Sequence, residues 1–153
     1  MNDLDEIDLK LLELLQNNGK LTTKEIANQV NLSSTPVYER IKRLENDGVI
    51  KKYVALLEAE KVGKRLAVFC DITLKQHTSE IGNQFIKDIM NFKYVCECYN
   101  ISGDHDFRLK VMVRDMKHYQ EFVLQDLGSI KNIGSVHSTF VIGVIKYNYE
   151  VPI

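Results

Sequence analysis

Two hydrophobic periodicities divide this chain, and each restricts its part of the sequence to a different kind of fold. Between residues 4 and 48 the apolar residues recur at helical spacing, which is the pattern of helices that bury one face. Between residues 66 and 147, runs that alternate apolar and polar residues are separated by helical stripes, which predicts strands interleaved with helices. The polar stretch 58–65 shows no period. We therefore expect two domains, residues 1–60 and 61–153.

Composition excludes several classes of protein. The chain is 44% hydrophobic and 27% charged, which is typical of a globular protein, and no window reaches the roughly 18 uncharged apolar residues that a membrane span requires. Residues 1–10 are acidic, where a secretory signal would be basic and then apolar. We expect a cytoplasmic chain with no membrane partner. The formal charge of −1 does not by itself indicate nucleic-acid binding.

The first domain carries the start and stop signals of three helices within 45 residues. Thr22 is a candidate N-cap for the second helix, and Glu25 three residues later completes a capping box. Asn31 can take the left-handed turn that ends this helix. The run 33–36 then opens a third helix with hydroxyl groups and a proline, and Gly48 ends it.

Three short helices with a turn of about four residues between the second and third form a helix-turn-helix. A short β segment is expected to follow over residues 49–55, so the N-terminal domain is expected to be winged-helix-like. The alternative is a three-helix scaffold that binds nothing.

The third helix has one aliphatic side and one polar side. At about 100° per residue, Val37, Ile41 and Leu44 cluster toward the core. The opposite side suits a DNA major groove, although any solvated helix face is polar. Residues 33–52 hold five Lys or Arg against three acids, a local charge of +2. The expected DNA-binding residues are Ser34, Thr35, Tyr38, Glu39, Arg40, Lys42, Arg43 and Lys51.

The second domain has the order β-α-β-β-α-β, which is the ferredoxin-like unit. Its antiparallel sheet should carry both helices on one face, so the fold class of the whole chain is α+β. The expected strands are 66–75, 94–102, 107–114 and 135–147, and the helical stripes fall within 81–92 and 116–127.

The last strand should not leave its sheet half solvated. Residues 140–145 are apolar on both sides of that strand, where a half-solvated sheet would alternate. Another copy of the chain is the expected cover, which predicts a homodimer or a higher assembly. The alternatives are a ligand or the N-terminal domain.

Few residues suggest chemistry. The cysteines Cys70, Cys96 and Cys98 are an odd number, which suits disulfides poorly. Cys96 and Cys98 lack the spacing and the second ligand pair of a zinc site. Motifs for a catalytic triad, a phosphate loop or a zincin are missing. We expect no catalytic residue, no metal and no cofactor, and therefore no enzyme.

The turn Gly103–Asp106 is more suggestive. Its two carboxylates and its imidazole could capture a small zwitterion, with a carboxylate, expected to be Asp106, for the ammonium group and backbone N–H groups for the ligand's own carboxylate. The alternative is an Asp-rich turn that bonds only locally.

Four segments together resemble the leucine-responsive/asparagine-regulator (Lrp/AsnC) family of transcription factors, and the resemblance covers nearly all of the chain. They are Leu4-Asp5 with Asp8, the run from Leu32 to Glu45, the run from Gly48 to Tyr53, and Ser102-Gly103-Asp104-His105-Asp106.

The resemblance implies an N-terminal DNA-reading domain and a C-terminal ferredoxin-like domain for dimerisation and effector sensing. It further implies dimers that associate, often into octamers, and an amino-acid effector bound between dimers. Position 105 is commonly aromatic in the family and position 100 often apolar. The implied effector residues are Asn100, Gly103, Asp104, His105, Asp106, Phe140, Val141 and Ile142.

The leading hypothesis is a sequence-specific regulator that binds double-stranded DNA at a pseudo-palindromic operator. One alternative is a ligand-independent DNA-organising protein of the same family. Another is a ferredoxin-like small-molecule-binding module or enzyme.

Overall fold

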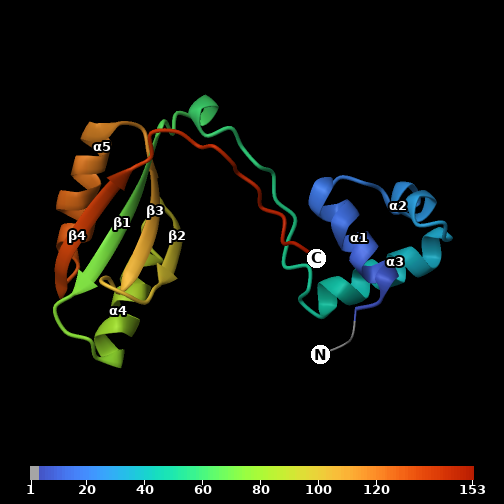
Figure 1. Ribbon diagram of the computed structural model, residues 1–153, viewed down its shortest axis with the longest axis horizontal. Helices are drawn as coiled ribbons and strands as arrows, with labels where there is room; N and C mark the ends of the chain where they lie inside the picture. The colour runs from blue at the N-terminus through green and yellow to red at the C-terminus, as the bar shows by residue number, and fades with distance from the viewer. Residues whose placement is uncertain (1–3) are drawn as a thin grey trace. The chain divides into compact units, whose positions relative to one another are not determined.

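The computed structural model describes residues 4–153, so the first three residues of the acidic N-terminal stretch lie outside it. The chain forms two compact units, Met1–Leu56 together with Lys146–Ile153, and Leu57–Ile145 (Figure 1). The C-terminal eight residues thus group with the helical unit rather than with the second domain. Their anchor is Gln16, whose side-chain amide exchanges hydrogen bonds of 2.6 and 3.1 Å with the backbone of Val151.

The first unit contains the three expected helices, α1 (Glu6–Asn17), α2 (Thr23–Gln29) and α3 (Ser34–Asn46). The capping box of Thr22 and Glu25 is confirmed, and α1 has a second one, formed by Asp5 and Asp8. Reciprocal capping satisfies N–H groups that have no partner inside a helix. The buried core of the unit is Leu11, Ile26, Ala27, Val37 and Ile41.

The turn between α2 and α3 follows from backbone chemistry. Asn31 has a φ of 54°, the left-handed conformation that asparagine tolerates better than most residues. Ser33 is the N-cap of α3, but its side chain makes no capping hydrogen bond. The third helical residue is Pro36, which has no N–H to donate. Gly48, with a φ of 72°, follows the end of α3.

The expected β segment at residues 49–55 is wrong. Residues 51–57 are extended and exposed, but they form no strand, because no strand of the described chain lies beside them. Tyr53 is held by its hydroxyl, which donates to the Glu45 carboxylate at 3.1 Å. Val54 and Leu57 lie exposed.

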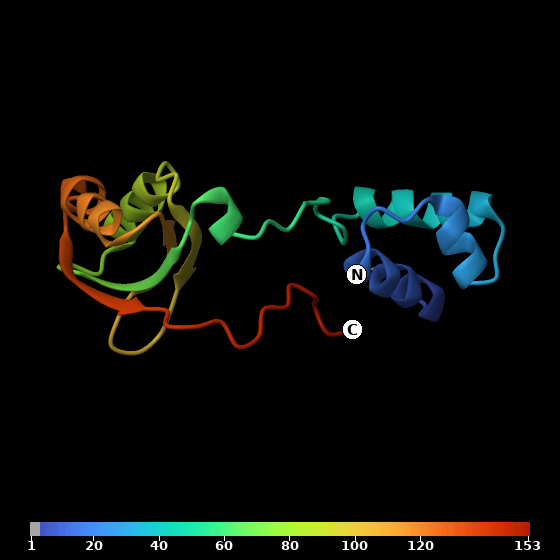
Figure 2. The same cartoon turned by 90° about the horizontal axis from the view of Figure 1, so that it is seen from above.

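The second unit is the expected four-stranded antiparallel sheet, in the order β2-β3-β1-β4. Figure 2 shows α4 and α5 on one face of it. The fold class is therefore confirmed. The strands are β1 (Leu66–Leu74), β2 (Val95–Asn100), β3 (Phe107–Val113) and β4 (Ile133–Phe140). The helices are η1 (Glu60–Val62), α4 (Ser79–Ile89), α5 (Met116–Glu121), η2 (Phe122–Asp126) and η3 (Leu127–Ser129).

The helices cover the apolar face of the sheet. Phe85 of α4 contacts Phe107 of β3 with ring centroids 4.6 Å apart. Tyr119 of α5 places its hydroxyl 2.6 Å from Ser138 and 3.2 Å from the Cys70 thiol. Burial raises the pKa of that thiol. Cys70 is therefore a core residue.

Two expectations about β4 are wrong. The strand ends at Phe140 rather than near residue 147, because its partner β1 begins at Leu66 and the N–H of Val141 bonds the carbonyl of Ala67. Beyond that bond no strand is left to pair with, and Ile142 lies fully exposed. The apolar residues after 140 therefore belong to an extended segment, not to the open face of the sheet.

That open face is largely polar. Asp71 of β1 pairs with Arg108 of β3, and Lys110 of β3 pairs with Glu97 of β2. The apolar surface that needs a covering partner is therefore on the extended segments and not on the sheet face. Across residues 4–153 no helix is long and apolar enough to cross a membrane.

Candidate functional site

The outer side of α3 is the first candidate site. Val37, Ile41 and Leu44 are buried, as their spacing predicts, so the opposite side of the helix faces away from the core. Most of the expected DNA-binding residues are exposed; they are Ser34, Thr35, Tyr38, Glu39, Lys42, Arg43 and Lys51, whereas Arg40 is half-buried.

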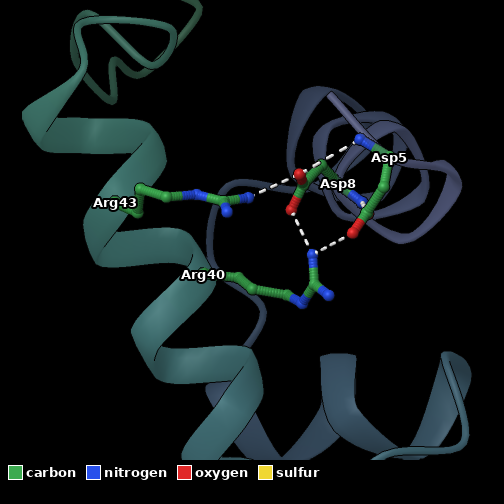
Figure 3. A network of polar contacts seen from close by, with 4 residues as sticks. All are labelled: Asp5, Asp8, Arg40 and Arg43. Carbon is green, nitrogen blue, oxygen red and sulfur yellow. Dashed lines mark hydrogen bonds and ion pairs between the residues drawn. The ribbon is translucent and has the colours of Figure 1, made fainter. Parts of the chain in front are cut away.

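Arg40 and Arg43 are held by two carboxylates at the start of α1 (Figure 3). The Nη1 atom of Arg40 lies 2.8 Å from Oδ1 of Asp8 and 2.6 Å from Oδ2 of Asp5. The Nη2 atom of Arg43 lies 2.5 Å from Oδ2 of Asp8. We call these four residues the α1–α3 ion-pair network. Through it, α3 is attached to α1 by charge as well as by its apolar side.

Asp8 is the central residue of this network, because it pairs with both arginines. Its side chain is only 1% exposed. An ionised carboxylate removed from water needs charge partners and hydrogen bonds, and Arg40 and Arg43 supply both. Asp5 accepts the backbone N–H of Asp8 at 2.8 Å. That hydrogen bond, followed by the one from Arg40, holds the pKa of the Asp5 carboxyl below its ordinary value.

The sequence contains a signal for this role of Asp8. Asp8 shares a helical face with Leu11 and Leu12, at spacings of three and four residues. A carboxylate on an otherwise apolar stripe needs cationic partners, and α3 provides two.

The third cation of α3, Lys42, also has a carboxylate partner. Its Nζ lies 2.7 Å from Glu45, a hydrogen bond that raises the pKa of Lys42 and lowers that of Glu45. A shallow groove of about 240 Å³ runs beside this pair. Its lining residues are Leu15, Gly19, Leu21, Thr23, Ile26, Tyr38, Ile41, Lys42, Glu45 and Tyr53.

The second candidate site is the turn between β2 and β3. Gly103 has a φ of 115°, which glycine adopts without the strain that a side chain would cause. Asp104 is exposed, whereas Asp106 is half-buried. Asn100 supports the turn by donating its side-chain amide to the carbonyl of Asp106 at 2.9 Å.

The carboxylate of Asp106 already has partners within its own unit. Its Oδ2 accepts the backbone N–H of Leu74 at 2.7 Å, and its Oδ1 lies 3.1 Å from Nδ1 of His77. Both oxygen atoms therefore connect the β2–β3 turn to the end of β1. Neither Leu74 nor His77 was expected at this site.

His105 of the turn and His137 of β4 lie together on the open face of the sheet. The Nδ1 atom of His105 is 3.0 Å from the hydroxyl of Thr73, and the ring of His105 stacks on that of His137 with centroids 6.1 Å apart. His137 is opposite Asp71 in the β1–β4 register. Asp71 in turn receives two hydrogen bonds from Arg108, at 2.6 and 2.9 Å. Only the strand register reveals this cluster, so the sequence pattern could not have indicated it.

The sheet register separates the expected effector residues into two groups. Phe107, which follows the β2–β3 turn, pairs with Ile72 near the end of β1. Phe140 pairs with Val68 near the start of β1. Within one chain, Gly103–Asp106 and Phe140–Ile142 therefore lie at opposite ends of the sheet.

The three cysteines lie outside both candidate sites. Cys96 and Cys98 of β2 are free and exposed, and Cys70 is free and buried. Within residues 4–153, no three His, Cys, Asp or Glu side chains are grouped so that they could hold a metal ion.

Comparison with known proteins assigns both parts of the chain. Residues 4–51 match the family of winged helix-turn-helix DNA-binding domains, and residues 67–151 match the Lrp/AsnC ligand binding domain. The DNA-binding transcriptional activator DecR of Escherichia coli is 39% identical over 150 residues, which cover 98% of this chain and 99% of DecR. The Bkd operon transcriptional regulator of Pseudomonas aeruginosa is 32% identical over the whole of both chains.

Solved structures agree with this assignment. A transcriptional regulator from Neisseria meningitidis, in complex with L-Met, has a TM-score of 0.93 and 32% identity, covering 98% of this chain and 97% of that one. An AsnC family transcriptional regulator from Agrobacterium tumefaciens has a TM-score of 0.92 and 38% identity, with coverages of 97% and 96%.

Replacing Asp8 with Asn is expected to lower the free energy of unfolding by about 2 kcal/mol. The change removes a buried negative charge from between two guanidinium groups that remain partly hydrated. Urea unfolding measures the loss, and Glu13→Gln is the matched control because it removes an exposed α1 carboxylate whose pair with Lys10 contributes at most about 1 kcal/mol. Equal effects of the two substitutions would contradict a structural role for the network.

The pair of Asp71 and Arg108 predicts a dependence of stability on acid pH. The hydrogen bonds from Arg108 hold the pKa of Asp71 below its ordinary value. Stability from this pair is therefore complete above the unfolded-state value of about 4 and is lost as the pH falls through the folded-state pKa. Arg108→Gln should lower the stability near neutral pH and weaken its loss in acid, as measured by urea midpoints from neutral to acid pH. The control is Lys131→Gln, an exposed lysine of the same unit. A profile that is unchanged by Arg108→Gln would refute the assignment.

Proposed function

The chain belongs to the Lrp/AsnC family of DNA-binding transcriptional regulators, and from that premise we propose that it binds a pseudo-palindromic operator as a homodimer whose DNA occupancy responds to an amino-acid effector. The observation that carries the proposal is α3 itself. Its aliphatic side is buried, whereas Thr35, Glu39 and Lys42 point away from the core.

This outer side has the chemistry that reads bases. Hydroxyl, amide and cationic groups can bond to base edges in the major groove, and a carboxylate can accept from cytosine. We assign base contacts to Thr35, Tyr38, Glu39 and Lys42. Ser34 and Lys51 adjoin the two ends of α3, where phosphate contacts fix a recognition helix in its groove. Arg40 and Arg43 stay predicted DNA contacts, but both already have carboxylate partners.

The proposed homodimer is supported by two extended, exposed segments. Residues 51–57 make no backbone–backbone hydrogen bond with residues 4–153 and have exposed apolar side chains, and Ile142, Val144 and Ile145 are exposed beyond the end of β4. Extended chain with unpaired N–H and C=O groups pairs readily with another chain, and apolar exposure of this kind marks an interface. A two-fold dimer would place its two α3 helices about 34 Å apart on one face of the duplex. Further association of dimers, up to an octamer, is part of the proposal.

The proposed effector site needs more than one copy of the chain. Because one chain places Gly103–Asp106 and Phe140–Ile142 at opposite ends of its sheet, a pocket that uses both groups must take them from different copies. This separation supports binding between dimers. The L-Met complex of the Neisseria relative supports an amino acid as the effector.

Within the turn, the two carboxylates are proposed to have different roles. Asp106 was expected to hold the ammonium group, but its two oxygen atoms already bond Leu74 and His77, so we assign it to shaping the turn. Asp104 is exposed and makes no ion pair with any residue between 4 and 153, so its carboxylate can receive the ammonium group of an effector. No residue of either candidate site suggests catalysis, and a non-enzymatic regulator is part of the proposal.

Selection of bound duplexes from a random pool should recover a pseudo-palindrome whose half-sites are centred about one helical turn apart. Repeating the selection and calorimetry with each of the twenty amino acids should identify at least one that changes occupancy and releases heat. Recovery of an operator with no response to any amino acid would leave a ligand-independent DNA-organising protein. Recovery of random sequence would overturn the regulatory proposal.

Ile142→Glu is expected to reduce the mass of the assembly in sedimentation experiments and to abolish the heat of effector binding. The side chain is fully exposed in the single chain, so the charge should leave the fold intact and act only where copies meet. Leu124→Glu is the matched control, since Leu124 is an exposed leucine outside the extended segments. An unchanged mass and unchanged heat would exclude Ile142 from the contact between copies.

A further inference from the structure

The cations of residues 4–56, which carry the three helices, fall into two sets. One set has carboxylate partners: Arg40 and Arg43 in the α1–α3 ion-pair network, Lys42 with Glu45, and Lys10 with Glu13. The other set makes no ion pair with any residue from 4 to 153, and all its members are exposed. These are Lys20, Lys24, Lys51 and Lys52.

The paired cations and their carboxylate partners together carry almost no net charge, so they attract an approaching phosphate only weakly. Arg40 and Arg43 stand against Asp5 and Asp8, and the Asp8 carboxylate is fixed because it is buried. Moving either guanidinium to a phosphate would leave a buried negative charge without its full complement of partners, which is strongly unfavourable. The network therefore offers little net attraction for DNA.

The unpaired set lies around the groove beside α3. Lys20 is between the groove residues Gly19 and Leu21, Lys24 follows the groove residue Thr23, and Lys52 precedes the groove residue Tyr53. Gly19 and the Tyr53 ring line the same groove and lie close together, because a Cβ built on Gly19 would be only 3.4 Å from the ring. This proximity brings the loop before α2 next to the segment that carries Lys51 and Lys52.

We propose that Lys20, Lys24, Lys51 and Lys52 make the charged phosphate contacts of residues 4–56, and that Asp8 acts as a positioning residue that keeps Arg40 and Arg43 out of phosphate contact. The inference rests on the proposed DNA-binding function and goes beyond it. It divides the work, so that the outer side of α3 reads bases while the lysines beside the groove carry the electrostatic attraction.

The two sets differ in what they predict for salt dependence. A lysine that neutralises a phosphate releases a counterion, so its loss flattens the plot of log affinity against log salt concentration by about 1 for each subunit bound. An arginine that a carboxylate already neutralises releases no counterion, so its loss leaves the salt slope unchanged. Arg43 keeps other N–H groups that could meet a base edge, but such a contact would alter sequence preference rather than the salt slope.

The test measures binding of the full-length chain to a random-sequence duplex over a range of sodium chloride concentrations. Random sequence suffices because phosphate attraction does not depend on the bases. The variants are Lys20→Gln, Lys24→Gln, Lys51→Gln and Lys52→Gln, compared with Arg40→Gln and Arg43→Gln, which keep Asp8 bonded to the remaining arginine. Lys117→Gln in α5 is the matched control, since it is an exposed lysine of the other unit. Thermal unfolding of each variant separates loss of binding from loss of fold.

The expected result is a flatter salt slope for each lysine variant with unchanged stability, and an unchanged slope with lower stability for the two arginine variants. Asp8→Asn should steepen the slope, because it leaves a positive charge unmatched. If Arg43→Gln flattens the slope as much as a lysine variant does, the inference is overturned. The same holds if all four lysine variants keep the wild-type slope. If the wild-type chain binds no duplex at all, the proposed function itself fails, and that outcome is distinct from the other two.

Discussion

The helical unit depends on one buried charge. The carboxylate of Asp8 lies inside the domain, where it would be strongly unfavourable without partners, and Arg40 and Arg43 supply them from α3. Because Asp8 also belongs to the capping box that begins α1, one carboxylate ties the start of α1 to the side of α3. The position of α3 is thereby fixed, and two of its cations are neutralised.

The second unit depends on the register of its sheet. Asp106 bonds the β2–β3 turn to the end of β1, whereas the last residue of β4 pairs near the start of β1. This geometry sends the two groups of expected effector residues to opposite ends. Assembly is therefore a requirement of the proposed effector site, and the exposed segment around Ile142 supplies an apolar surface for it.

Local chemistry made much of this fold predictable. The capping box of Thr22 and Glu25, the left-handed Asn31 and the alternation that marks each strand of the second unit are each encoded within a few neighbouring residues. The errors concern residues 49–55 and 141–147, which have strand-like composition without a strand beside them. A strand exists only where a partner accepts its hydrogen bonds, and no local pattern reports whether that partner is in the same chain.

By itself, the sequence determined which residues are helical, which faces of the helices are apolar and which turn is rich in carboxylates, because each of these depends on neighbours within about four positions. Only the tertiary structure decided that Arg40 and Arg43 face Asp8, that His105 stacks on His137, and that the effector residues separate. Each of these features relates residues that are more than thirty positions apart in the sequence. Polar side chains at such distances find one another through the packing of the backbone, which periodicity and spacing do not specify.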